Sequence, residues 1–335
     1  MFAYLIRRLV QGVFVIVVVS FITFVIFFIV PKLLGGNLAV LYAGKSPSQA
    51  TINAVTDKLG LNKPIPVQYL EYMKGLVAGR TFGTVPPVVN CPAPCLGFSF
   101  ANNTLVRPQL VGDFPVTLSL AIGASVLWLF FGVLAGVIAA LRKGRIADRA
   151  VMVGALAGIS MPVNFTALVV ALLVNTQWKL YGDNGLQYVP FTQNPLSWAW
   201  NLLFPWLVLA FLTAATYARI TRATMLETLS EDYVRTARAK GLRETVVVGK
   251  HALRSLLTPI VTLFGLDFGA LLGGAVVTEF VFGLHGIGLD AIDAIGRQDI
   301  PTVMGVTLFA STFIVVANIV VDMLYAVLDP RVRLG

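Results

Sequence analysis

Residue types that carry enzyme chemistry are sparse in this chain of 335 residues. It has two histidines, His251 and His285, which cannot by themselves form a two-histidine zinc centre of the protease kind. Gly44-Lys45-Ser46 matches the end of a phosphate-binding loop, but Ala39 stands where that motif requires its earlier glycine. The sequence therefore predicts no catalytic residues, no metal site and no ATP-hydrolysing site in this chain.

The two cysteines, Cys91 and Cys95, lie in the short segment Cys-Pro-Ala-Pro-Cys. One interpretation is a disulfide that closes a small loop in an oxidising compartment, and two free thiols are the alternative. A metal site is not expected, because two ligands without a nearby histidine or carboxylate cannot complete a tetrahedral shell.

Acidic residues within apolar runs are the remaining candidates for function. Placing a carboxylate within a membrane costs free energy unless the group faces protein or water. Such a residue therefore indicates either a substrate pathway or pairing between helices. Asp267 lies in the middle of such a run, and we expect it to face a substrate cavity or a partner protein. Glu279 and Asp322 lie nearer to the ends of their runs, where pairing between helices is the stronger alternative.

A helix irregularity is expected around Pro162, because proline removes a backbone donor and clashes with the preceding turn. Ser160 and Asn164 flank this position. Carbonyl groups freed there could line a path for substrate, although packing explains the two residues equally well.

The elements that position these residues are predicted to be membrane-spanning helices. The chain is 57% hydrophobic and 12% charged, too apolar for one globular core. Residues 9–30 carry no charge, and at about 1.5 Å per residue they cross a hydrocarbon layer of about 30 Å. Similar runs predict an all-α membrane protein with six spans: 9–30, 114–141, 150–178, 198–218, 259–278 and 302–327.

The distribution of basic residues predicts the orientation of these spans. With both ends inside, the inner segments 1–8, 142–149, 219–258 and 328–335 hold 16 of the 25 lysines and arginines. The net charge of +9 then reflects the membrane topology, with some attraction to anionic lipid, and does not indicate nucleic-acid binding. Arg7 and Arg8 could precede a signal peptide, but the run that follows is too long, which favours a retained first helix.

Three parts of the chain are expected: 1–30 with the first span, an extracytoplasmic segment 31–113, and a core 114–335. In the outer segment, residues 46–79 are predicted to be helical with an interruption at Pro64 and Pro66. Residues 84–111 are rich in Pro, Asn, Gly and Cys and predict an irregular loop. Two further outer loops, 179–197 and 280–301, are also expected.

The inner segment 219–258 is predicted to contain a short, well-capped helix. Ser230 suits its N-cap and Gly241 suits the left-handed position after its last turn. Tyr233, Ala237 and Gly241 recur every four residues and are expected to share one face. Such a short helix needs a docking surface, either on another protein or within this chain.

This helix resembles the coupling loop of bacterial binding-protein-dependent ABC importers. The similarity rests on Ala237-Arg238-Ala239-Lys240-Gly241-Leu242 and is greatest to the first permease subunit of dipeptide and oligopeptide importers. The Glu-Ala-Ala opening of the general pattern is replaced by Arg235-Thr236-Ala237. Segments 60–69, 115–118, 158–162, 273–279, 318–325 and 329–333 also resemble this subfamily, so the resemblance covers nearly the whole chain.

The resemblance implies a type I importer permease that forms half of a translocation pathway in a bacterial inner membrane. Its implied partners are a homologous second permease, cytoplasmic ATPase subunits that bind ATP and magnesium, and an external peptide-binding protein. Nickel or another small solute is the alternative substrate. An ATP-independent carrier is the rival class, and the pattern shows no internal repeat with broken helices that would favour it. The residues implied to contact the ATPase are Tyr233, Val234, Arg235, Ala237, Arg238, Ala239, Gly241 and Leu242.

Overall fold

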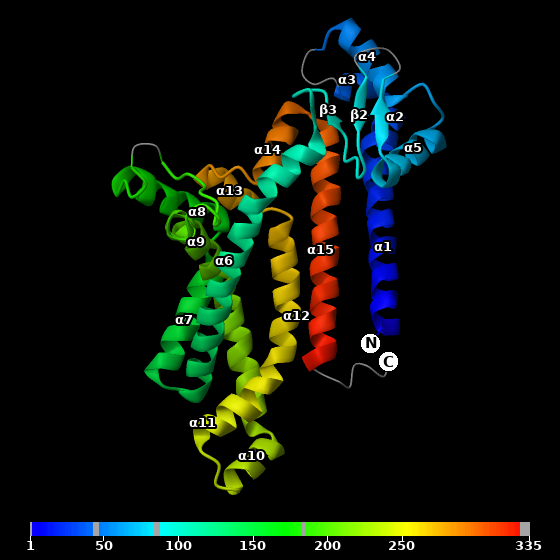
Figure 1. Cartoon of the computed structure of the whole chain (residues 1–335). Coiled ribbons are helices and arrows are strands. Elements are labelled where there is room, and N and C mark those ends of the chain that lie inside the picture. The colour runs from blue at the N-terminus through cyan, green and yellow to red at the C-terminus, as the bar shows by residue number, and fades with distance from the viewer. Residues whose placement is uncertain (1, 43–46, 84–87, 183–184, 329–335) are drawn as a thin grey trace.

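The computed structural model describes residues 2–42, 47–83, 88–182 and 185–328, and it is mainly helical (Figure 1). The Gly44-Lys45-Ser46 motif lies outside the described residues. Within them, five helical stretches are long and apolar enough to cross a membrane, and a bent helix pair makes a sixth span. The five are Leu5–Leu33, Val106–Leu141, Pro195–Ser230, Glu244–Leu272 and Ile300–Met323. The predicted all-α fold with six spans is confirmed.

These spans are built from long helices with local irregularities. The first combines α1 (Phe2–Phe24), the π-helical turn η1 (Val25–Ile29) and α2 (Val30–Leu33). The other unbroken spans use helices that all begin before the predicted apolar stretches, because polar residues at their ends are still compatible with a helix. They are α6 (Val106–Leu141), α9 (Pro195–Ser230), α12 (Leu253–Leu272) and α15 (Ile300–Leu328).

The third predicted span, 150–178, is broken in its middle. α7 (Ile146–Ser160) and α8 (Val163–Leu172), which continues into the π-helical turn η2 (Leu173–Gln177), are bent by 95° relative to each other. Pro162 lies at the bend with φ −64° and ψ 133°, an extended conformation that ends the helix before it. The expected irregularity at Pro162 is confirmed, and it takes the form of a break in the span.

The fifth predicted span, 259–278, is too long, and the expected loop 280–301 is mostly helical. α12 ends at Leu272, and Gly274 has a φ of +118°, which a residue with a side chain rarely adopts. Two short helices follow, α13 (Val276–Phe282) and α14 (Ile287–Arg297). The apolar run therefore contains a chain reversal that hydropathy cannot detect.

The segment after the first span forms a small helical and β layer at one end of the molecule (Figure 1). The predicted helices there are present as α4 (Gln49–Leu59) and α5 (Ile65–Ala78), preceded by α3 (Leu38–Tyr42). Ser48 caps α4 by accepting a hydrogen bond from the Thr51 amide at 3.2 Å. Buried side chains from this layer, including Tyr42, Leu59 and Phe98, pack with Phe28 of η1 and Met304 of α15.

The prediction of an irregular loop over 84–111 is wrong for its described part. β1 (Arg80–Phe82) pairs antiparallel with β2 (Val89–Cys91), and β3 (Phe98–Ser99) pairs antiparallel with β4 (Thr104–Leu105). α6 already begins at Val106. These strands have two or three residues each, too few for an alternating pattern to stand out in the sequence.

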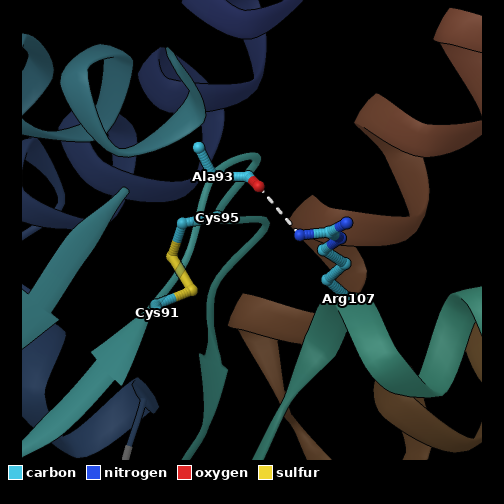
Figure 2. The surroundings of a disulfide bond; sticks show 4 residues. All are labelled: Cys91, Ala93, Cys95 and Arg107. Carbon is cyan, nitrogen blue, oxygen red and sulfur yellow. Dashed lines mark hydrogen bonds between the residues drawn. A yellow bond between two sulfur atoms is a disulfide. The ribbon is translucent and has the colours of Figure 1, made fainter. Parts of the chain in front are cut away.

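A disulfide joins Cys91 to Cys95, with their Cα atoms 5.5 Å apart. Figure 2 shows that the loop it closes faces Arg107, whose Nη1 donates a hydrogen bond to the Ala93 carbonyl at 2.8 Å. Because Arg107 belongs to the first turn of α6, the closed loop is attached directly to a spanning helix.

Close helix packing organises the spans. α6 lies along α9, where a Cβ added at Gly123 would overlap the indole of Trp206. A Cβ at Gly136 would lie 2.6 Å from the Ala218 carbonyl oxygen, so both glycines allow the helix backbones to approach. α1 packs on α15, where Arg8 Nε lies 3.1 Å from Asp322 Oδ2. This confirms interhelical pairing for Asp322.

Candidate functional site

The short helix predicted in the inner segment is α10 (Asp232–Ala239), at the opposite end of the molecule from α3, α4 and α5 (Figure 1). It follows α9 with only Glu231 between them. The prediction that Ser230 caps it is wrong, because Ser230 is the last residue of α9 and its Oγ donates to the Glu227 carbonyl at 2.6 Å. The helix therefore extends α9 after a sharp turn.

The carboxyl end of α10 has the predicted geometry. Gly241 has a φ of +75°, in the left-handed region where glycine is preferred. The Gly241 amide donates to the Arg238 carbonyl at 2.9 Å, and the Leu242 amide donates to the Ala237 carbonyl at 3.4 Å. This pair of bonds is a Schellman motif, which ends the helix and turns the chain away.

One face of α10 is buried within this chain. Val234 is 0% exposed and Ala237 is 6% exposed, and they pack with Val247 and Leu229. Val247 belongs to the π-helical turn η3 (Val247–Ala252), which follows the short helix α11 (Glu244–Val246) and leads into α12. For Val234 and Ala237, therefore, packing inside the chain is the observed role.

The opposite face of α10 is open. Arg235, Ala239 and Gly241 are exposed, and Leu242 is 41% exposed. Tyr233 is also 45% exposed, although its hydroxyl lies 2.8 Å from Ser255 Oγ. The predicted common face of Tyr233, Ala237 and Gly241 is therefore divided, because Ala237 points inward. We call Arg235, Ala239, Gly241 and Leu242 the outward face.

An ion pair fixes the turn beside the outward face. Arg238 donates to Glu244 through Nε at 3.1 Å and through Nη2 at 2.7 Å. The bond to Glu244 raises the pKa of Arg238, and the two-point contact orients the chain entering α11. Arg238, which the resemblance implied to contact the ATPase, therefore has a partner within this chain.

Comparison with known proteins assigns the chain to a family. Residues 132–334 match the model described as binding-protein-dependent transport system inner membrane component. The chain belongs to this family of transport permeases. Residues 1–121 match the model for the N-terminal part of such membrane components. Both halves of the permease are therefore covered.

Curated relatives of the permease match along nearly its whole length. It is 36% identical over 333 residues to the di/tripeptide transport system permease protein DppB of Pseudomonas aeruginosa, covering 94% of each chain. It is 33% identical over 355 residues to the dipeptide transport system permease protein DppB of Escherichia coli K12, covering 99% of each. A putative peptide transport system permease protein of Brucella abortus is 35% identical, again covering 99% of each.

The fold of the permease is also seen in a solved structure. A chain of the MetNI methionine ABC transporter, in inward facing conformations, aligns with a TM-score of 0.52 at 18% identity. The alignment covers 67% of this chain and 97% of the other. It supports the type I importer permease fold for the shared part.

Asp267, predicted to face a cavity or a partner, lies half-buried on α12. The Tyr217 hydroxyl of α9 donates to its Oδ2 at 2.8 Å. Tyr217 is itself 1% exposed and packs near Trp128. The carboxylate is thus held by one buried partner and keeps part of its surface open.

Glu279, the second candidate for the substrate pathway, is 0% exposed, and its carboxylate is surrounded by hydrogen-bond donors. Its Oε1 accepts from Thr117 Oγ1 at 2.8 Å, and its Oε2 accepts from the Leu289 amide at 3.0 Å. Thr117 Oγ1 in turn accepts from the Ile287 amide at 2.9 Å. These contacts join α6, α13 and α14, so the geometry gives Glu279 a structural role and no open surface.

Ser160 and Asn164 lie on either side of the bend between α7 and α8, and both are exposed. Ser160 Oγ donates to the Leu156 carbonyl at 2.8 Å, a bond that satisfies the hydroxyl within its own helix. The two residues are close to the bend but are not brought together with Asp267 or Glu279 by any described contact.

Several polar residues that organise the permease had no signal in the sequence. Asp299, which is 2% exposed, accepts from Ser99 Oγ at 2.6 Å and from Thr302 Oγ1 at 2.7 Å. Among the described residues, no group of three or more His, Cys, Asp or Glu is placed to hold a metal ion. The contacts of Asp299 join β3 to the turn between α14 and α15 and to the first turn of α15.

Proposed function

We propose that this chain is a permease subunit of an ATP-driven importer of di- or oligopeptides. The observation that carries the proposal is the combination of an outward face on α10 with full-length similarity to permeases named for peptide transport. In this proposal the chain forms half of the translocation pathway and has no catalytic residues. A homologous second permease forms the other half.

ATP hydrolysis takes place in partner chains. Cytoplasmic ATPase subunits bind ATP and magnesium, and each receives a coupling helix in a groove on its surface. The proposed contact residues in this chain are the outward face, together with Tyr233 and Arg238, which border it. Val234 and Ala237 support this face from beneath, since both are buried against η3 and α9.

The proposed location is the bacterial inner membrane, with both ends of the chain and α10 in the cytoplasm. Two observations support this orientation: α10 lies far from the layer of α3 to α5 (Figure 1), and the segments on its side are rich in arginine and lysine. The layer of α3 to α5 then faces outward, where an external peptide-binding protein delivers substrate.

Reconstitution tests this function directly. The chain is assembled in lipid vesicles with a homologous second permease, ATPase subunits and a peptide-binding protein from the same organism. Uptake of a labelled dipeptide is expected with ATP and not with a non-hydrolysable analogue. Uptake of nickel in place of dipeptide would support the alternative substrate. Uptake by this chain alone without ATP would instead identify a carrier and contradict the proposal.

Within this function we assign Asp267 to the substrate pathway. Its half-buried carboxylate can accept a hydrogen bond from the ammonium group of a peptide, and one such charged contact contributes about 1.5 to 3 kcal/mol. Asp267→Asn is therefore expected to lower the initial rate of dipeptide uptake by about tenfold. Tyr217→Phe, which removes the observed donor to Asp267, is the control and should stay close to the original rate. Unchanged uptake in Asp267→Asn would contradict the assignment.

A further inference from the structure

An ion pair with a buried carboxylate and a partly exposed guanidinium connects α7 to α9. Asp148, in the first turn of α7, is 4% exposed. It accepts hydrogen bonds from Arg222 Nε at 2.5 Å and Arg222 Nη2 at 2.9 Å, and from the Gly144 amide at 2.9 Å. A two-point contact between a guanidinium and a carboxylate fixes orientation as well as distance.

The position of Arg222 gives this pair a direct link to α10. Arg222 lies in the last part of α9, which ends at Ser230, and α10 begins after the single residue Glu231. A displacement of α10 therefore passes into α9 without a flexible linker. Through Asp148, the same displacement reaches the start of α7.

The other end of α7 is also held against α9. A Cβ added at Gly158 would lie 2.9 Å from the Cβ of Ala215, so the two helices are in close contact there. Just beyond this contact the chain bends by 95° between α7 and α8. α7 is thus attached to α9 at both ends, by charge at one end and by close packing at the other, and beyond the bend α8 also packs on α9.

Burial distinguishes this pair from the ion pairs of α10 itself. The side chains of Arg238 and Glu244 are 40% and 55% exposed, and those of Arg235 and Asp232 are 69% and 98% exposed. Exposed pairs are screened by water and salt and contribute little. The Asp148 side chain is 6% exposed and that of Arg222 is 25% exposed, so their attraction is screened far less.

We propose that Asp148 and Arg222 are positioning residues that make α7 move together with α9 when the coupling helix moves. Movement at α10 then reaches the bend at Pro162 and changes the shape of the broken span. This inference rests on the proposed function. It adds a specific mechanical connection between the ATPase side and the interior of the permease.

Replacement of both residues by apolar ones of similar size separates this role from simple stability. Removing one partner leaves an uncompensated buried charge, whereas replacing both is often neutral or stabilising. The test compares Asp148→Asn, Arg222→Gln and the double variant Asp148→Leu with Arg222→Met. Each is assembled with its partners in vesicles, and the readouts are the amount of complex, the ATP hydrolysis rate and the number of dipeptides imported per ATP.

The double variant is expected to assemble and hydrolyse ATP, with dipeptides imported per ATP lowered by about tenfold, within the usual range of coupling between sites. Arg219→Gln, which changes an exposed arginine on the same helix, should keep the original ratio. If the double variant keeps the original number of dipeptides imported per ATP, the inference is overturned. Packing alone would then be sufficient to make α7 move with α9. Absence of ATP-dependent uptake in the unmodified complex would instead refute the proposed function.

Discussion

Ala239→Trp is expected to abolish ATP-driven uptake while leaving the permease folded in the membrane. Ala239 belongs to the outward face of α10 and is exposed, so an indole there does not disturb the buried contacts of Val234 and Ala237. It would instead separate the helix from the ATPase surface, where shape complementarity must match that of protein interiors. Uptake should fall by at least about a hundredfold, which corresponds to about 2.7 kcal/mol of lost interaction.

Two further variants make this result specific. Ala239→Ser adds little volume and should retain uptake. Gly241→Asn tests the turn after α10 without introducing a steric clash, because no atom lies within 4 Å of a Cβ placed there. Asparagine also tolerates the left-handed conformation better than other residues with a side chain. Binding of the ATPase subunits is measured by co-purification. Full uptake by Ala239→Trp would show that this face does not contact the ATPase.

Gly123→Val is expected to prevent α6 from packing on α9. Even the first side-chain carbon would overlap the indole of Trp206, which is 7% exposed and donates its Nε1 to the Ser119 carbonyl at 3.0 Å. Overpacking of an interior costs about 1 to 3 kcal/mol and sometimes more. The valine must displace the Trp206 ring, which is held by its own hydrogen bond. We therefore expect a destabilisation in the upper part of this range. The measurement is the thermal unfolding midpoint in detergent, together with the yield of monodisperse protein.

A glycine with free space provides the matched comparison. No atom lies within 4 Å of a Cβ placed at Gly154 on α7, so Gly154→Val removes a glycine from a helix without a clash. The midpoint should remain close to the original value. Equal losses in Gly123→Val and Gly154→Val would mean that helix propensity, and not the contact with Trp206, explains the effect.

Features with a local cause were predictable from the sequence. Long apolar runs with at most one charged residue indicated all six spans, because the length needed to cross a membrane is fixed by the bilayer. The left-handed Gly241 and the irregularity at Pro162 were also predictable, since each depends on the backbone of one residue type. The N-cap at Ser230 was not, because α9 continues to that residue and the serine bonds backwards.

Features that depend on distant residues had no such signal. Asp148 and Arg222 are 74 residues apart, and Thr117 and Glu279 are 162 residues apart. Nothing local indicates that these side chains meet, because the meeting follows from how the helices pack. The same reason explains why the sequence left Glu279 open between a substrate pathway and pairing between helices: its partners are mostly backbone amides, which every sequence offers.

The contact between Ser99 and Asp299 spans 200 residues, and this separation has a consequence for biosynthesis. At about 5 to 20 residues per second, the ribosome needs about 10 to 40 s to make the chain between them. During this interval the layer of α3 to α5 has been translated but lacks Asp299 and Met304, which complete its packing. A chaperone or protease on that side of the membrane would therefore encounter it with its apolar interior incompletely covered.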